Sequence, residues 1–281
     1  MRLLSFGEII WDVYPDKKFI GGAPFNFAAH ARRAGADTYL LSAVGNDALG
    51  AEALEWVRHY GVSAELVAVN DRPTGECRVT LDLNGVPSYE IVTDTAYDMI
   101  PPIAAPRDFD VLAFGTLALR GENNRSTIKK LVSEGGFKEI FVDLNIRPPF
   151  GYRESILLAL ESATILKVSD EELPAVMTAI YGEYHGIDES TLRLKADFAG
   201  LKIILVTCGG SPARAYDFSE DKVYTCDSVK TEVVSTVGAG DSYGATFLVH
   251  YMNGSPVYEA MCEAAKVSAF VVSRTGAIPE E

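Results

Sequence analysis

The feature that most constrains the fold of this chain is a repeated alternation of short apolar runs with segments of helical periodicity. Apolar runs occupy residues 2–10, 38–44, 111–115, 139–144, 163–168 and 202–207, and a hairpin is expected over 213–218 and 222–226. Helices are expected over residues 24–34, 47–60, 239–252 and 257–273, where apolar side chains recur at helical spacing. Strands that alternate with helices predict a mostly parallel sheet covered on both faces, so we expect an α/β fold.

Residues 66–97 interrupt this alternation. Residues 77–83 alternate polar and apolar side chains, and they are followed by Asn84-Gly85, a strong signal for a tight hairpin turn. Residues 87–92 then alternate again, as the returning strand of a hairpin does. This part of the chain is therefore expected to form antiparallel β-structure outside the main sheet.

The hairpin and residues 13–20 together predict a small β-sheet lid inserted in a single domain that spans residues 1–281. Val79, Leu81 and Leu83 alternate onto one face of the hairpin. A thin sheet with an apolar face needs a cover. We expect this lid to close over a bound ligand or to pair with the lid of a second copy in a homodimer.

The charge of the chain excludes several classes of partner. It carries 39 acidic and 25 basic residues, for a formal net charge of −14. A nucleic-acid-binding protein usually presents a basic face, and the Lys/Arg runs of this chain do not exceed two residues. Anionic membrane surfaces are disfavoured for the same reason. An anionic small ligand would have to be met by local donors such as helix N-termini.

The sequence carries no targeting or membrane segment that we recognise. Glu8 and Asp12 interrupt the first apolar run too early for a signal peptide. No stretch approaches the roughly 20 apolar residues that a membrane helix needs. The four cysteines contain no CxxC pair and are expected to be free thiols in a reducing compartment. We therefore expect a cytoplasmic protein.

The sharpest chemical signal is Gly238-Ala239-Gly240-Asp241, which stands directly before an apolar helix. Glycines let the backbone approach a ligand closely, and the free N–H groups of a helix N-terminus bind anions. A carboxylate in the first turn, as at Asp241, can accept a proton from a hydroxyl group beside that anion. Taken alone, the motif is equally consistent with a tight helix start without function.

A second glycine pair, Gly21-Gly22, precedes the helix that contains Asn26. Asp12 and Asn26 fall at the carboxyl ends of predicted strands or in adjoining loops, where such sheets bind their ligands. Carboxylate and amide groups complement the donors and acceptors of a polyol. These residues are therefore candidates for a sugar site.

Together with Gly45-Asn46-Asp47, these residues resemble the amino-terminal signature of the ribokinase-like (PfkB) family. Gly238-Ala239-Gly240-Asp241 resembles its carboxy-terminal signature, and the resemblance runs from residue 7 to residue 279. It implies a Rossmann-like sheet with a β lid, ATP and Mg²⁺ as cofactors, and transfer of the γ-phosphoryl group to a sugar hydroxyl. Asp241 would be the base, and the Gly238–Gly240 turn would form the anion hole.

The resemblance also implies roles for further residues. The sugar contacts would be Asp12, Gly21, Gly22, Asn26 and Arg147. The nucleotide side would be formed by Asn145, Lys167, Thr207, Gly209, Gly238 and Gly240, with Glu172 organising Mg²⁺ through water. Without function, Glu172 would be a helix-dipole glutamate and Arg147 a partner in a surface ion pair.

Three positions depart from the family pattern. Ser169 stands where the family's Asn-x-x-Glu motif has asparagine, which weakens the inferred metal network, and Pro212 replaces a glycine of the adenine-side loop. Ser235 replaces an aspartate that helps relatives to hold K⁺, so we expect weak or absent activation by K⁺. Glu280 could reach the same region and restore the missing charge.

The residues quoted above do not decide which sugar is phosphorylated. Residues 7–12, 96–98 and 143–148 look most like bacterial fructokinases, so fructose is the expected substrate. The alternatives are 2-keto-3-deoxygluconate and ribose. An acidic sugar should demand extra basic residues in the lid, where Arg78 is the only clear candidate in the hairpin strands.

Two other function classes compete with a kinase. A sugar-binding homologue without turnover is disfavoured by the intact Asp241 and its Gly-Ala-Gly turn. A nicotinamide-dependent oxidoreductase is disfavoured because no Gly-x-Gly-x-x-Gly follows the first strand.

Overall fold

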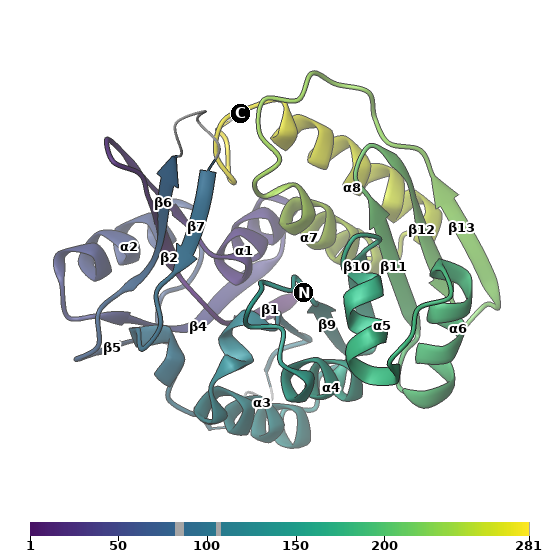
Figure 1. Cartoon of the computed structure of the whole chain (residues 1–281), viewed down its shortest axis with the longest axis horizontal. Helices are drawn as coiled ribbons and strands as arrows, with labels where there is room; N and C mark the ends of the chain where they lie inside the picture. Colours follow the sequence, from purple (N-terminus) through teal and green to yellow (C-terminus); the bar gives the residue numbers. More distant parts are fainter. Residues whose placement is uncertain (82–86, 105–107, 281) are drawn as a thin grey trace.

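The computed structural model describes residues 1–81, 87–104 and 108–280 and contains two sheets. A nine-stranded sheet has the order β13-β12-β11-β10-β9-β8-β1-β4-β5, and a four-stranded sheet has the order β3-β2-β6-β7. Figure 1 shows the small sheet beside the main sheet, at the same side of the molecule as α1 and α2. The predicted combination of a main sheet and a smaller one is confirmed.

The main sheet is parallel apart from its last hairpin. Its strands are β1 (Arg2–Phe6), β4 (Asp37–Gly45), β5 (Val67–Asn70), β8 (Val111–Phe114), β9 (Glu139–Asp143), β10 (Ile165–Ser169), β11 (Ile203–Cys208), β12 (Ser211–Asp217) and β13 (Lys222–Cys226). Leu3 and Leu4 are both fully buried although they point to opposite faces of β1. Burial on both faces explains why these strands appear in the sequence as continuous apolar runs.

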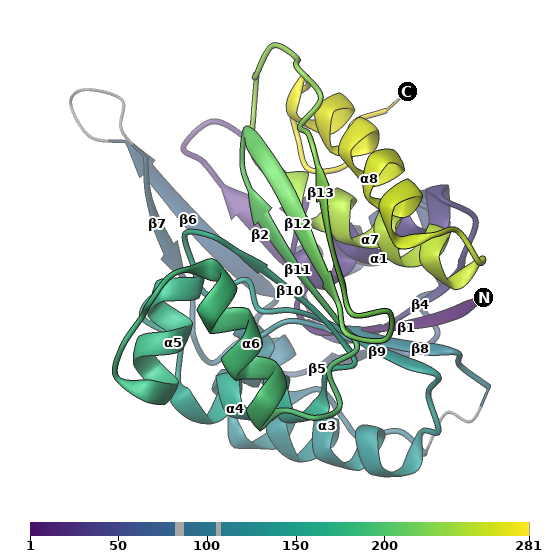
Figure 2. The same ribbon diagram turned by 90° about the vertical axis from the view of Figure 1, so that its right-hand side faces the viewer.

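Helices cover both faces of this sheet (Figure 2). One layer contains α1 (Ala23–Arg33), α2 (Ala48–His59), α7 (Ala239–Met252) and α8 (Val257–Val272). The other layer contains α3 (Glu122–Glu134), α4 (Arg153–Ser162), α5 (Leu173–Tyr181) and α6 (Ile187–Asp197). Two 3₁₀ helices, η1 (Ala96–Met99) and η2 (Leu117–Arg120), lie in the segments between β7 and α3. Within the described residues no helix is both long and apolar enough to cross a bilayer.

The predicted first strand over residues 2–10 is wrong in one respect, because it contains parts of two strands. β1 ends at Phe6, and the chain then enters β2 (Ile10–Val13) of the small sheet. β2 pairs with β3 (Lys18–Gly21) and with β6 (Gly75–Leu81). Both strands contain consecutive buried apolar residues, so periodicity alone did not separate them. They differ in their pairing partners, which belong to different sheets.

The predicted lid over residues 66–97 is too long at both ends. β5 pairs in parallel with β4 at the edge of the main sheet, and η1 buries Tyr97 completely in the main core. The small sheet keeps only β6 and β7 (Pro87–Ile91) from this range. Edge strands and lid strands show the same half-exposed alternation, which explains the error. The predicted Asn84-Gly85 turn lies outside the described residues.

The side chain of Asn124 of α3 joins η1, η2 and Ile100, the residue that follows η1. Its fully buried side chain donates to the carbonyl oxygens of Tyr97 and Ala118, at 2.7 and 2.8 Å, and accepts from the amide of Ile100 at 3.1 Å. One side chain therefore satisfies three backbone groups, one in each 3₁₀ helix and one in Ile100 directly after η1.

We predict that Asn124→Ala lowers the free energy of unfolding by about 2–5 kcal/mol, because buried backbone groups lose their partners. Urea denaturation followed by circular dichroism measures this change. Ser126→Ala, on the exposed side of the same helix, is the matched control and should stay within about 0.5 kcal/mol of the parent. Equal stability of the two variants would contradict the role given to Asn124.

Candidate functional site

The start of α7 is shaped by glycine. Gly238 caps the helix in the left-handed region, with φ of 80° and ψ of −4°, and no side chain caps this end. A Cβ atom on Gly238 would lie 2.5 Å from the carbonyl oxygen of Ala277, so only glycine fits. The amides of the first turn have no acceptor within the helix. Free amides of this kind are what an anion-binding helix end needs, and the binding of an anion there stays a prediction.

Asp241 lies in this first turn and is held by Asn26 of α1. The amide nitrogen of Asn26 donates to Asp241 Oδ2 at 2.8 Å across 215 residues of sequence. Burial and the charge of Asp143 raise the pKa of Asp241 to about 6, while the hydrogen bond from Asn26 opposes this rise. A carboxylate of that pKa is ionised at neutral pH and is a stronger base than an ordinary aspartate.

The second glycine pair brings α1 to the same place. Gly22 is the N-cap of α1 with φ of 110°, and a Cβ atom there would lie 2.5 Å from the carbonyl oxygen of Glu8. Gly21 ends β3, where a Cβ atom would lie 3.5 Å from Asp12 Oδ2. Both glycines thus allow close approach between the small sheet, the loop after β1 and α1.

A buried ion pair supports the glycine turn from below. Lys167 Nζ of β10 lies 2.8 Å from Asp143 Oδ2 of β9, and the two side chains are only 5% and 11% exposed. Burial disfavours the charged form of Lys167, yet the charge of Asp143 raises the pKa of its ammonium group overall. A Cβ atom on Gly240 would lie 3.1 Å from Lys167 Nζ. Lys167 therefore places a positive charge directly under the start of α7.

A groove of about 620 Å³ leads to the same turn. Thr207 and Gly209 at the end of β11 line it on one side, and Ala239 and Gly240 line it at the start of α7. The remaining wall includes apolar side chains from the segment before α7 and from α8, among them Val229, Val233, Ala265 and Val272. An apolar slot that ends at an anion-binding helix terminus fits a nucleotide, with the base in the slot and the phosphates at the turn.

Asp12 and Arg147 lie on the side of the small sheet. Burial raises the pKa of Asp12, and the charge of Arg147 opposes that rise. Arg147 is exposed to solvent in the loop after β9, and its charge also acts on Asp143 and Asp241. It is therefore a shared cation of the site and not a partner in a single surface ion pair.

Glu172 is held differently from the expectation for a metal-organising residue. Its Oε1 accepts from the amide of Ile146 at 2.5 Å, and its Oε2 accepts from the amide and the hydroxyl of Ser169 at 2.9 and 3.0 Å. It joins the loop after β9, where Asn145 has a φ of 41°, to the end of β10. Ser169 thus binds the glutamate itself at the position where the family has asparagine.

The donors of the site are compatible with a hydrated Mg²⁺ ion. Among the described residues no group of three or more His, Cys, Asp and Glu side chains could hold a metal ion directly. Asp143 Oδ1 and Asn26 Oδ1 are buried and have no hydrogen-bond partner within the described ranges, so they can accept from bound water or substrate. This donor set fits Mg²⁺ that takes most of its ligands from phosphate oxygens and water.

Ser235, Pro212 and Glu280, which the sequence analysis singled out, each have defined neighbours in the structure. Ser235 accepts a hydrogen bond from the amide of Val237 at 3.3 Å, and Pro212 lies in β12 next to an irregularity in its pairing with β11. Glu280 lies 3.8 Å from His59 Nε2 of α2 and is largely exposed. Its carboxylate therefore takes a partner on α2.

Sequence reasoning missed Glu8, Asp143 and Arg120. Asp143 stands inside a motif that was recognised, but its pairing with Lys167 follows only from the neighbouring positions of β9 and β10. Glu8 directly follows Gly7 at the end of β1, and Arg120 ends η2 after β8. The position of Glu8 after the first strand was an available signal, whereas nothing local to Arg120 marks it.

The chain was compared with known proteins. The model of the pfkB family carbohydrate kinases matches residues 4–281. A fructokinase of Rhizobium leguminosarum bv. trifolii is 29% identical over 267 residues, which cover 88% of this chain and 78% of that protein. A nucleoside kinase of Methanothermobacter thermautotrophicus is also 29% identical, over 91% of this chain and 79% of its own length.

Solved structures agree with this fold. The apo fructokinase of Vibrio cholerae O395 superposes with a TM-score of 0.86 at 21% identity, covering 98% of this chain and 99% of that one. A putative ribokinase II of E. coli superposes with a TM-score of 0.85, also at 21% identity, over 99% and 95% of the two chains. The predicted Rossmann-like sheet with a small β-sheet beside it is confirmed.

We predict that Lys167→Met lowers the free energy of unfolding by about 3–5 kcal/mol, because it leaves the charge of Asp143 buried without a partner. The double variant Lys167→Met/Asp143→Asn should lose less, since no charge is then stranded. Urea denaturation of both variants gives the comparison. Lys138→Met, in an exposed pair with Asp110, is the control and should cost at most about 1 kcal/mol. A double variant at least as destabilised as Lys167→Met alone would contradict the pairing.

Proposed function

The chain belongs to the pfkB family of carbohydrate kinases, and on this basis we propose that it transfers the γ-phosphoryl group of ATP to a hydroxyl group of a neutral sugar, with fructose preferred. The observation that carries the proposal is the carboxylate of Asp241 in the first turn of α7, oriented by Asn26 at 2.8 Å. It lies where the end of an apolar groove meets a helix N-terminus. A base and an anion-binding site side by side are what phosphoryl transfer to an alcohol requires.

In this mechanism Asp241 accepts the proton of the sugar hydroxyl while that oxygen forms a bond to the γ-phosphorus. The bond between the γ-phosphorus and the bridging oxygen breaks, and ADP leaves with the electron pair. The amide of Gly240, at the positive end of the helix dipole, stabilises the charge on the phosphoryl group in transit. The amide of Ala239 would join it only by giving up its hydrogen bond to the carbonyl oxygen of Thr236 at 3.3 Å. Asn26 keeps the carboxylate in the orientation that reaches the hydroxyl.

The nucleotide would bind in the groove, with Thr207 and Gly209 on the base side and Asn145 near the triphosphate. Lys167 contributes fixed positive charge beneath the turn, which an acidic chain otherwise lacks near its phosphates. Mg²⁺ supplies further charge neutralisation of the phosphates when bound, with Glu172 positioned behind its water shell.

The sugar would lie between α7 and the small sheet, in contact with Asp12, Gly22, Asn26 and Arg147. Asp12 comes from β2, so the small sheet forms one wall of the sugar site. In the hairpin strands Arg78 lies 3.7 Å from Glu76 and is thus paired already. A sugar acid such as 2-keto-3-deoxygluconate would lack the lid cation that it needs, whereas a neutral ketose would not.

The family contains other acceptors, and one of them is the second candidate. The relative named nucleoside kinase, at 29% identity, makes a nucleoside the alternative acceptor. Ribose remains an alternative among the sugars. A cytoplasmic location, a homodimer formed through the small sheet and weak activation by K⁺ also stay predictions.

We predict that Asp241→Asn lowers kcat by about 10²–10⁴, because it removes the base and keeps its shape and hydrogen bonding. The affinity for ATP should change little. A coupled assay of ADP release with fructose measures both. Near wild-type turnover in this variant would refute the assignment of the base.

The pH dependence of the wild-type enzyme provides an independent check of the same residue. The base is active when ionised, and its pKa is about 6, so kcat at saturating fructose should be nearly constant above that value. It should fall about tenfold per pH unit below it. Activity that rises toward pH 5 would contradict this role of Asp241.

We predict that fructose gives the highest kcat/KM in a panel that also contains ribose, 2-keto-3-deoxygluconate and adenosine. Asp12→Ala should raise KM for fructose by about tenfold or more, because a sugar hydroxyl loses its acceptor in a buried site. Faster turnover of another panel member would overturn the choice of fructose and leave the kinase assignment intact.

A further inference from the structure

Glu8 is a buried carboxylate that takes no part in the proton transfer proposed for Asp241. It follows β1 directly, and its residue is only 3% exposed. Within the described ranges its carboxylate accepts no hydrogen bond from another side chain. Burial, together with the charge of Asp241, raises the pKa of Glu8 to about 7, against the lowering effects of a hydrogen bond from its own backbone amide and of the charges of Arg147 and Arg120. Glu8 is therefore electrostatically coupled to the base and to the shared cation of the site.

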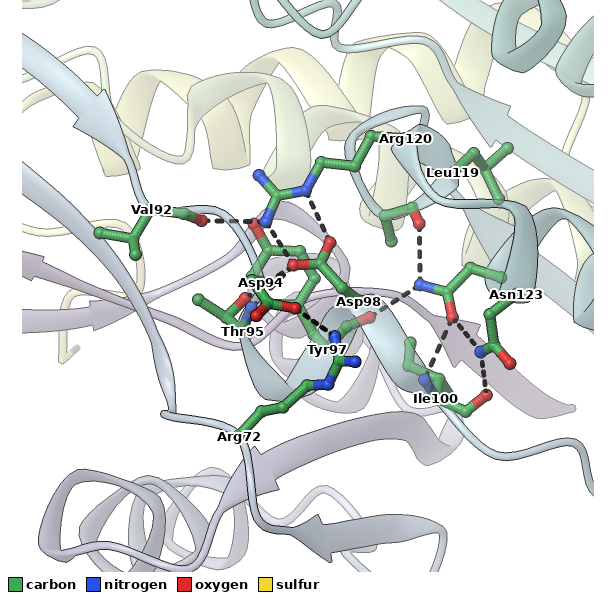
Figure 3. Close-up of polar contacts among 12 residues, drawn as sticks. Arg72, Val92, Asp94, Thr95, Tyr97, Asp98, Ile100, Leu119, Arg120 and Asn123 are labelled. Carbon is green, nitrogen blue, oxygen red and sulfur yellow. Dashed lines mark hydrogen bonds and ion pairs between the residues drawn. The ribbon is translucent and has the colours of Figure 1, made fainter.

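Arg120 ends η2, which packs against the residue before Glu8, since a Cβ atom on Gly7 would lie 3.6 Å from the Cβ atom of Ala118. Asp98 fixes Arg120 in place (Figure 3). Its Nε donates to Asp98 Oδ1 at 2.6 Å, and its Nη2 donates to Asp98 Oδ2 at 2.7 Å and to the carbonyl oxygen of Val92 at 2.9 Å. The two side chains are 6% and 12% exposed. The guanidinium group is also in contact with the rings of Tyr97 and Phe150, at 4.8 and 4.9 Å from their centroids. Such a bidentate, stacked arginine cannot reorient easily.

One nitrogen of this guanidinium group has no partner among the described residues. Figure 3 shows Nη1 of Arg120 without a hydrogen bond, and the buried hydroxyl group of Tyr97 is likewise unpartnered. The charge of Glu8 acts on both groups. A fixed cation with unused donor capacity behind a buried glutamate favours the ionised form of that glutamate and restrains its position.

The charges around Glu8 limit which ligand can bind there. Lys167 is paired with Asp143, and Arg120 with Asp98. Arg147 acts on three other carboxylates, which are Glu8, Asp12 and Asp241. Counted over these described side chains, the sugar side of the site carries more negative than positive charge. A carboxylate or phosphate group on the substrate would be repelled there, whereas hydroxyl groups can donate to the carboxylates.

We propose that Glu8 accepts a hydrogen bond from a hydroxyl group of the sugar and excludes anionic sugars, and that Arg120, fixed by Asp98, is the positioning residue for Glu8. This inference rests on the proposed sugar kinase function and adds a residue that determines which sugars are accepted. Asp241 acts on the hydroxyl that is phosphorylated, and Glu8 binds a different hydroxyl of the same molecule.

The test compares Glu8→Gln with the wild type in ADP release with fructose and with 2-keto-3-deoxygluconate. We expect KM for fructose to rise about 5- to 50-fold, as for the loss of a charge-assisted hydrogen bond, with kcat changed much less. For the sugar acid, KM should fall or stay the same, so that the preference for the neutral sugar decreases about tenfold or more. Glu134→Gln, an exposed site with the same change of charge, is the control and should alter neither value.

The positioning role of Arg120 is tested by a double-variant cycle. Arg120→Gln should raise KM for fructose in the wild-type background and have little further effect once Glu8 is glutamine. A purely structural role would give equal effects in both backgrounds, which would overturn this part of the proposal. Arg120→Lys keeps the charge and should retain much of the affinity for fructose.

Two measurements keep these results separable from the kinase assignment. If Glu8→Gln does not fold, Glu8→Asp is measured in its place. This variant keeps the negative charge on a side chain one methylene group shorter, so KM for fructose should rise while the sugar acid stays excluded. If the wild type releases no ADP with any sugar, the kinase assignment fails, and fructose binding without nucleotide is then measured by calorimetry. A folded Glu8 variant with unchanged KM, or with unchanged affinity in that titration, overturns the proposal, as does a wild type that binds no fructose.

Discussion

The hydrogen bond from Asn26 to Asp241 is the interaction on which the site depends. It joins two helix N-termini that are far apart in the sequence, and each helix begins at a glycine that a side chain could not replace. The buried ion pair of Lys167 with Asp143 packs against the first turn of α7 at Gly240. These contacts are long-range, so the base is oriented only when the main sheet and both helices have formed. Folding and the chemistry of the site are therefore coupled through a few buried polar groups.

Charge sets the second constraint. A chain with a net charge of −14 repels phosphates and sugar acids at long range. In the proposed function, phosphates are met by local donors, which are the free amides at the start of α7 and the buried Lys167. The sugar side shows the opposite arrangement, because carboxylates outnumber free cations around Glu8. This division of charge is what the proposed function needs, since an anionic nucleotide would bind at one end of the site and a neutral polyol at the other.

The sequence allowed the main sheet, the terminal helices and the pairing of glycine motifs with Asp241 and Asn26 to be predicted, because these depend on local patterns. It did not separate β1 from β2 or β5 from the lid strands, since the partner of a strand decides its sheet and periodicity does not record partners. Arg120 and Asp98 were missed for a related reason. Their importance comes from a contact between η1 and η2, and the resemblance noted for residues 96–98 says nothing of the partner of Asp98. Glu172 was placed correctly near the strand ends, but its hydrogen bonds to Ile146 and Ser169 required the structure.

We propose that this chain moves a phosphoryl group from ATP to a sugar hydroxyl. The most direct measurement is ³¹P NMR of the purified protein with ATP, Mg²⁺ and fructose at a pH well above the pKa of Asp241. The account predicts a sugar monophosphate resonance that grows in step with ADP, with no inorganic phosphate beyond the control without protein. ADP accompanied only by inorganic phosphate, or an unchanged ATP spectrum with every sugar tested, would contradict it.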